Sequence, residues 1–243
     1  FNISTTCALL LSAMGVPVTK HGNYGVSSNC GSSNVLEALG YQFPRTSEEA
    51  KRCFERDGSV FLHAPFFHPA MRNVAQVRRA LGVRTLFNIL GPLSNPARPS
   101  HQLTGTFDLR THRLYAWSLE RMGVQAAVAH SLDGYDEISL TADTRVFSTR
   151  KHFLMLSASD FGTEYVEPSA LKGAETLEGN AAIIRTILKG DGTPAQNQVV
   201  AANAALALDV WNSDSSLDSA FREALAFLKS GNAMDHLNDL LDR

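Results

Sequence analysis

The spacing of apolar residues predicts short strands that alternate with helices along the chain. Residues 1–14 begin with polar side chains and continue with small and apolar residues on every face, which predicts a buried helix. Short apolar runs bounded by turn residues predict strands at 16–23, 59–64, 84–88, 102–107, 126–131 and 152–156. Apolar periodicity, with capping and stop residues, predicts helices at 33–39, 47–56, 69–81, 111–122, 179–188, 194–208 and 217–228.

This alternation favours an α/β fold with a central mixed, largely parallel sheet flanked by helices. We interpret residues 1–243 as one domain, because the length suits a single large domain. Residues 66–98 contain two steps into proline near their end, which force extended backbone, so we interpret this segment as helical or hinge-forming. Ligands bind at the carboxyl ends of strands in such sheets. The loops after Val18, Ala64 and Ser131 are therefore the expected site positions.

Charge and composition exclude several classes of partner. The chain has 22 Lys and Arg against 24 Asp and Glu, so a general nucleic-acid-binding surface is not expected. No stretch approaches the roughly 20 consecutive apolar residues of a membrane span, and the first residues lack the pattern of a signal peptide. We expect a cytoplasmic protein with no membrane partner. The three cysteines, Cys7, Cys30 and Cys53, are too few and too scattered for a disulfide framework.

A polar loop that follows the first predicted strand is a candidate phosphate site. It runs from Lys20 through two glycines, Gly22 and Gly25, to the paired hydroxyls of Ser27 and Ser28. A cationic donor, close backbone approach and serine hydroxyls are what a phosphate group requires. A solvated turn is the alternative interpretation, because polar Gly-Ser loops are common.

Carboxylates gather in the loop that follows the apolar run 126–132. Asp133, Asp136 and Glu137 lie within five residues of each other, and adjacent carboxylates can face one hard cation. Mg²⁺ characteristically takes one or two carboxylates together with substrate phosphates and waters. An exposed acidic turn is the alternative.

One predicted helix carries His68, Arg72 and Arg78. An arginine that faces a cleft can bind a carboxylate through two hydrogen bonds, although most helix arginines face water. A single histidine such as His68 is more often a core or capping residue than a catalyst.

Taken in order, these motifs resemble the anthranilate phosphoribosyltransferase family of tryptophan biosynthesis. The resemblance covers essentially the whole chain, and its most distinctive runs are Lys20-His21-Gly22-Asn23 and residues 88–93. The other matching runs lie at residues 2–5, 26–28, 31–32, 36–40, 68–72, 77–79, 94–96 and 133–139.

The resemblance implies a fold like that of nucleoside phosphorylases and phosphoribosyltransferases, with remnants of a small helical domain. It implies transfer of the phosphoribosyl group of phosphoribosyl pyrophosphate (PRPP) to the amine of anthranilate, with release of pyrophosphate. Two Mg²⁺ ions per active site and a homodimer of the full-length protein are also implied. No side chain is expected to act as nucleophile or base, because the substrate amine attacks directly.

The resemblance also assigns roles to individual residues. Ser4, Asp136 and Glu137 are expected to bind metal, and Asn23 and Arg78 to bind anthranilate. The expected PRPP-binding residues are Asn2, Ser4, Thr5, Lys20, Asn23, Ser27, Ser28 and Ser32.

Departures from the family pattern set the remaining expectations. The family's Gly-rich pyrophosphate loop and N-terminal helical domain would precede Phe1, which leaves open whether residues 1–243 are active by themselves. Tyr24 and Gly25 replace an Arg-Ser pair, and Asn34 replaces a frequent Asp. The alternatives are a pyrimidine-nucleoside phosphorylase, whose loop characteristically reads Lys-His-Ser-Thr-Gly-Gly, and a non-catalytic nucleic-acid-binding relative.

Overall fold

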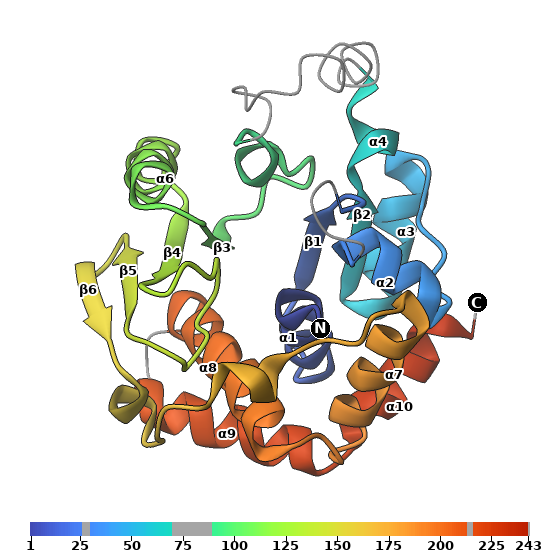
Figure 1. Cartoon of the computed structure of the whole chain (residues 1–243). Coiled ribbons are helices and arrows are strands. Elements are labelled where there is room, and N and C mark those ends of the chain that lie inside the picture. The colour runs from blue at the N-terminus through green and yellow to red at the C-terminus, as the bar shows by residue number, and fades with distance from the viewer. Residues whose placement is uncertain (26–29, 70–88, 213–215, 243) are drawn as a thin grey trace.

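The strands of the protein form two separate sheets in the computed structural model, which describes residues 1–25, 30–69, 89–212 and 216–242 (Figure 1). Strands β1 (Val18–Gly22) and β2 (Ser59–His63) pair in parallel. The second sheet has the order β3 (His101–Gly105), β4 (Gln125–Ser131), β5 (Thr144–Ser148) and β6 (His152–Leu156). Its β3–β4 pair is parallel, whereas β5 and β6 join antiparallel. The sheet is therefore mixed.

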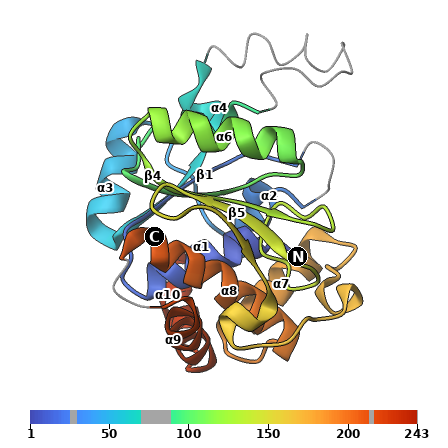
Figure 2. The same ribbon diagram turned by 90° about the vertical axis from the view of Figure 1, so that its left-hand side faces the viewer.

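Helices cover both faces of the four-stranded sheet. Helix α6 (Leu109–Arg121) lies on one face and α8 (Pro194–Trp211) on the other, as Figure 2 shows. Buried strand β4 reflects this arrangement, because Ala126 and Val128 pack with α6 while Ala127 and Ala129 join the main core with α8. Alternate residues of a strand point to opposite faces. A continuous apolar run is therefore what a strand covered on both sides requires.

Helix α8 is the centre of the main core. Residues 199–206 are all at most 4% exposed. Helices α1 (Ile3–Ala13) and α9 (Leu217–Lys229) pack directly against α8, and α7 (Leu177–Leu188) and α10 (Asn232–Leu241) pack against α1 and α9 in the same core. Arg150, in the turn between β5 and β6, caps the carboxyl end of α8. Its guanidinium donates hydrogen bonds to the carbonyls of Asp209 and Val210 over 3.1 and 3.3 Å.

The β1–β2 sheet is enclosed by shorter elements. Helix α1 packs against β1, and α3 (Ser47–Asp57) packs against β2. Helix α2 (Ser32–Leu39) follows the loop after β1, and the short α4 (Ala64–Phe67) continues β2. Single 3₁₀ turns occur at η2 (Gly91–Ser94), η3 (Ala158–Phe161) and η4 (Pro168–Leu171). Among the helices in the described part of the chain, none is long and apolar enough to cross a membrane.

The predicted α/β architecture with a mixed sheet is confirmed. Most predicted helices and strands are present within two or three residues of their expected ends. Strand β5 and helix α10 were not predicted, and the helix expected at 69–81 and the strand expected at 84–88 fall almost entirely outside the described residues. Whether 66–98 forms a hinge therefore stays a prediction.

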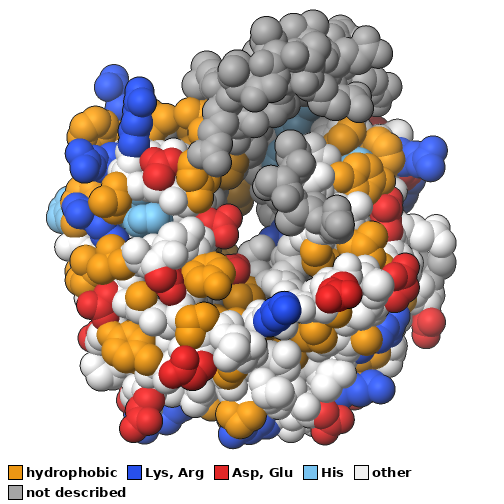
Figure 3. Space-filling model, viewed as in Figure 1, with side chains coloured by type: hydrophobic (Ala, Val, Ile, Leu, Met, Phe, Trp, Pro, Cys, Tyr) orange, Lys and Arg blue, Asp and Glu red, His pale blue; other side chains and the backbone are white. Residues whose placement is uncertain are grey.

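A hollow separates the two sheets on one side of the molecule. Figure 3 shows the surface hollowed between the four-stranded sheet and the β1–β2 sheet. The loop after β4 and the loop after β1 both follow strand ends, so the fold brings them to the two walls of this hollow. This is the position that the sheet rule predicts for a ligand site.

Candidate active site

The loop after β4 is held by its own polar side chains. The Asp133 carboxylate accepts hydrogen bonds from the hydroxyls of Thr141 and Ser139, the second over 3.5 Å. Asp133 therefore fixes the shape of the loop. Asp136, which is exposed, and Glu137, which is half-buried, are the two carboxylates that remain for a ligand.

Gly105 lets this acidic loop lie directly against the end of β3. A Cβ atom at Gly105 would stand 1.3 Å from the Asp136 carbonyl oxygen, so only glycine permits the contact. Gly105 was not among the residues singled out from the sequence. A glycine inside the predicted strand 102–107 was the available signal, since glycine in a strand often marks close backbone approach.

The acidic loop and the first turn of α1 meet. The Glu137 carboxylate faces the backbone N–H of Ser4, which lowers the pKa of that carboxyl. Asn2 caps the same helix, because its Oδ1 accepts from the Thr5 N–H over 2.9 Å and from the Ser4 hydroxyl over 3.3 Å. The Thr5 side chain is fully buried, and its hydroxyl has no hydrogen-bond partner within the described ranges. Ser4 and Glu137, far apart in sequence, thus belong to one site.

Lys20 of β1 joins the same group. Its Nζ donates to the Ser4 hydroxyl over 3.2 Å. Burial lowers the pKa of Lys20, while the nearby Cys7 thiol and the carboxylates of Glu137 and Asp136 act in the opposite direction. A cationic amine and two carboxylates therefore face the same small space, together with the amino-terminal end of a helix.

The chemistry of this cluster fits a divalent cation. Burial and the adjacent Asp136 carboxylate raise the pKa of Glu137 to about 8, although Lys20 and the Ser4 N–H oppose the shift. Two carboxylates that disfavour each other's charge are stabilised by a metal ion between them. Within the described residues, no group of three or more His, Cys, Asp and Glu side chains is placed so that it could hold a metal ion by itself. The other ligands of Mg²⁺ must then be hydroxyls, substrate oxygens or water.

The loop after β1 folds tightly back on helix α2. A Cβ at Gly22 would lie 2.1 Å from the Ser32 hydroxyl, and one at Gly31 would lie 2.1 Å from the Gly25 nitrogen. The Asn23 carbonyl accepts hydrogen bonds from the Ser33 N–H and, over 3.4 Å, from the Ser32 hydroxyl. Gly22 and Gly31 therefore permit close packing inside the protein, and the expected approach of a phosphate to Gly22 and Gly25 stays a prediction.

Two histidines pair at the carboxyl end of β1. The Nε2 atoms of His21 and His68 are 3.2 Å apart, and burial lowers the pKa of His21 to about 4, with His68 adding to the effect. His21 also bonds the backbone of Gly91. The sequence contains no local signal for this pair, because His21 and His68 lie on different elements.

Of the remaining predicted site residues, the structure describes only Asn23. Asn23 is exposed in the loop after β1, and its Oδ1 accepts the Tyr24 N–H over 2.8 Å. Ser27, Ser28 and Arg78 lie outside the described residues. Their expected roles therefore stay predictions.

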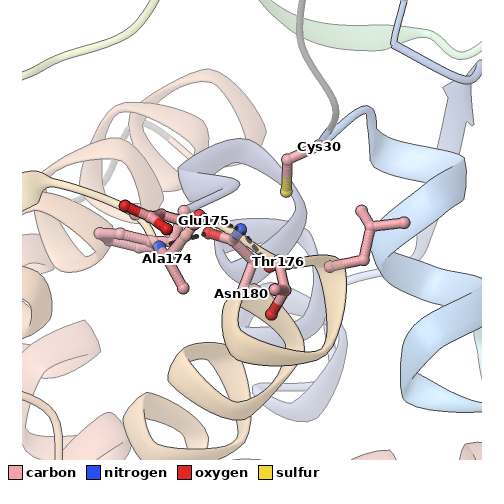
Figure 4. Close-up of a pocket in the computed structure, with 8 residues that line it drawn as sticks. Cys30, Ala174, Glu175, Thr176 and Asn180 are labelled. Atoms are coloured by element: carbon pink, nitrogen blue, oxygen red, sulfur yellow. Dashed lines mark hydrogen bonds between the residues drawn. The ribbon is translucent and has the colours of Figure 1, made fainter.

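A pocket of about 270 Å³ opens at the start of α7 (Figure 4). Residues 173–177 form one side, and the Asn180 amide holds this segment through hydrogen bonds to Ala174 and Thr176. Phe1 and Cys30 complete the lining.

Known proteins of similar sequence identify the family of this chain. The family model described as "Glycosyl transferase family, a/b domain" matches residues 1–234. A curated anthranilate phosphoribosyltransferase from Christiangramia forsetii is 45% identical over 240 residues, which cover 99% of this chain and 72% of the relative. The chain belongs to the anthranilate phosphoribosyltransferase family. A second anthranilate phosphoribosyltransferase, from Bacteroides fragilis, is 40% identical over all of this chain and 73% of its own length.

Solved structures of the same family share the fold. Anthranilate phosphoribosyltransferase from Thermus thermophilus superimposes with a TM-score of 0.91 at 38% identity, over 99% of this chain and 72% of that one. The Saccharomyces cerevisiae enzyme in complex with PRPP and Mg gives 0.90 at 27% identity, over 100% and 69%. These likenesses favour the transferase over the phosphorylase and the nucleic-acid-binding alternatives.

Gly105→Ala is expected to displace the acidic loop. The new Cβ would overlap the Asp136 carbonyl, so we expect the free energy of unfolding to fall by about 1–3 kcal/mol. Chemical denaturation measures this change. Gly91→Ala is the control, because a Cβ there would meet nothing within 4 Å. A Gly105→Ala protein as stable as the wild type would show that the loop does not rest on β3.

Glu137→Gln is expected to change how stability depends on pH in the absence of Mg²⁺. The unfolded carboxyl loses its proton near pH 4.5 and the folded one near pH 8. Between these values the unfolded state binds fewer protons, so the free energy of unfolding of the wild type falls as pH rises. Because Glu137 is only half-buried, solvent screens the effect, and we expect a gain for the variant on the order of 1 kcal/mol at pH 8.

Urea denaturation at both ends of that pH range measures the difference. Glu164→Gln, at an exposed carboxylate outside the cluster, is the matched control. Equal stability of Glu137→Gln and wild type at pH 8 would contradict the raised pKa.

Proposed function

We propose that this protein transfers the phosphoribosyl group of PRPP to the amine of anthranilate. The products are N-(5-phosphoribosyl)anthranilate and pyrophosphate, and the reaction belongs to tryptophan biosynthesis. The main support is the meeting of three groups: the Lys20 Nζ donates to the Ser4 hydroxyl over 3.2 Å, and the Glu137 carboxylate faces the Ser4 N–H. It joins groups suited to a phosphate with groups suited to a metal ion in a single hollow.

The charges of the site suit the bond that must break. As the bond between the anomeric carbon of PRPP and pyrophosphate stretches, positive charge develops on the sugar and negative charge on the leaving group. The Lys20 ammonium stabilises that negative charge, and the PRPP-facing amides and hydroxyls of Asn2, Ser4 and Ser32 orient the phosphates. Thr5, Asn23, Ser27 and Ser28 are proposed to complete the PRPP-binding residues.

Magnesium fits the acidic part of the site. We assign one ion to the Ser4 hydroxyl and a second to Asp136 and Glu137, two per active site. When bound, Mg²⁺ supplies further positive charge to the pyrophosphate oxygens. The solved structure of the S. cerevisiae relative with PRPP and Mg supports this choice of ion.

Anthranilate is proposed to bind on the opposite wall through Asn23 and Arg78. A guanidinium can hold the anthranilate carboxylate by two parallel hydrogen bonds and so orient the amine toward the sugar. The amine itself attacks, so no side chain need form a covalent bond. A solved complex of the S. cerevisiae relative with 4-fluoroanthranilate supports an acceptor of this chemistry.

The remaining proposals concern organisation. Residues 1–243 would act as one α/β catalytic domain, in which residues 66–98 form a helical or hinge segment. The full-length protein would be a cytoplasmic homodimer that binds neither nucleic acid nor membranes. Its partners would then be the two small-molecule substrates.

Asp136→Asn combined with Glu137→Gln is expected to lower Mg²⁺-dependent turnover about 100-fold or more, because the metal loses both carboxylates. The full-length gene product that contains residues 1–243 is incubated with anthranilate, PRPP and Mg²⁺, and the loss of anthranilate fluorescence is followed. Glu164→Gln with Glu167→Gln, two exposed carboxylates, is the matched control. No turnover by the wild type would reject the proposed function.

Arg78→Ala is expected mainly to raise the KM for anthranilate, by about 10-fold or more, because a bidentate carboxylate contact is lost. The KM for PRPP should change little. Steady-state kinetics with each substrate varied in turn separates the two effects. A similar rise in both KM values would exclude Arg78 as the specific ligand of the anthranilate carboxylate.

A further inference from the structure

A buried asparagine on α8 holds the backbone next to Glu137. Asn203 is 4% exposed, and its Oδ1 accepts the Ile138 N–H over 3.1 Å. Its Nδ2 donates to the Ile138 carbonyl over 2.8 Å and to the Val199 carbonyl of its own helix over the same distance. One amide therefore binds both backbone groups of a single loop residue.

These hydrogen bonds define where the acidic loop ends and the core begins. The Ile138 side chain is 1% exposed and belongs to the main core, whereas the preceding residue, Glu137, carries its carboxylate to Ser4. Asn203 thus fixes the peptide from which the Glu137 side chain projects. On the other side of the loop, Gly105 supports only the Asp136 carbonyl.

The surroundings of Asn203 make an asparagine unexpected on packing grounds alone. Residues 199–202 and 204–206 are all apolar and at most 1% exposed. Burying a polar side chain in such a helix is unfavourable unless it makes hydrogen bonds. A fully satisfied buried amide specifies one definite arrangement of the groups it binds.

We propose that Asn203 is a positioning residue that sets the orientation of Glu137 toward the Mg²⁺–pyrophosphate group. This inference rests on the proposed function, because it assigns Glu137 to the metal. Groups that orient metal ligands typically change metal affinity 10–100-fold when they are lost. Asn203 touches neither metal nor substrate and acts only through the peptide of Ile138.

The test compares two asparagines of the same helix. Asn203→Leu removes the contacts to Ile138, and Asn197→Leu is the matched control. Asn197 is also 4% exposed, but its Nδ2 donates to the Gly192 carbonyl, away from the acidic loop. Asn203→Ala replaces the leucine variant where leucine prevents folding, which circular dichroism reports.

The first readout is native-state hydrogen exchange of the Ser4 and Ile138 amides, which needs no turnover. We expect both amides to exchange faster in the Asn203 variant than in the Asn197 variant, because the Glu137 carboxylate no longer holds its place against Ser4. Loss of stability alone would accelerate exchange in both variants alike. Equal protection of the Ser4 amide in the two variants would overturn the proposal.

The second readout is the Mg²⁺ dependence of turnover by the full-length protein. For Asn203→Leu we expect the Mg²⁺ concentration at half-maximal rate to rise about 10–100-fold, with an unchanged KM for anthranilate. An unchanged Mg²⁺ requirement would also overturn the proposal. If the wild type does not consume anthranilate at all, the proposed function fails, whereas the Ser4 exchange still decides whether Asn203 positions Glu137.

Discussion

The approach of the Glu137 carboxylate to the amino-terminal turn of α1, at Ser4, is the constraint on which the site depends. It joins the first turn of a buried helix to a loop of the four-stranded sheet, and Lys20 of the other sheet reaches the same serine. Helix termini offer unpaired N–H groups, and the Asn2 cap uses one of them on Thr5 while Ser4 turns to the loop. The polar groups of two separate sheets therefore meet at one point.

The apolar core fixes the relative position of the two sheets that carry these polar groups. Helix α8 packs against α1 on one side and against β3 and β4 on the other, so it sets the distance between the two walls. Because close-packed interiors transmit displacement with little compression, a shift of α8 would move both walls. Two neighbouring carboxylates repel each other, and burial and Asp136 accordingly raise the pKa of Glu137 to about 8. A bound divalent cation would offset this repulsion.

The sequence allowed prediction of the groups that local patterns specify. The helix over 47–57 follows from Thr46, whose hydroxyl accepts the Glu49 N–H, and buried β4 follows from its apolar run. Strand β5 was missed because polar Thr144 and Ser148 are buried at its ends through contacts with distant parts of the fold. Asn203 and the pair of His21 and His68 were missed for the same reason. Their meaning lies in contacts between elements, which no local pattern contains.

The long separation in sequence between Ser4 and Glu137 has a consequence for biogenesis. During synthesis, α1 and β1 leave the ribosome well before the acidic loop, and α8 follows later still. Contacts between distant segments require closure of a long chain loop and form late. In the nascent chain, the polar amino-terminal end of α1 is therefore made before the acidic loop that it contacts. The site cannot assemble until the ribosome has synthesised that loop.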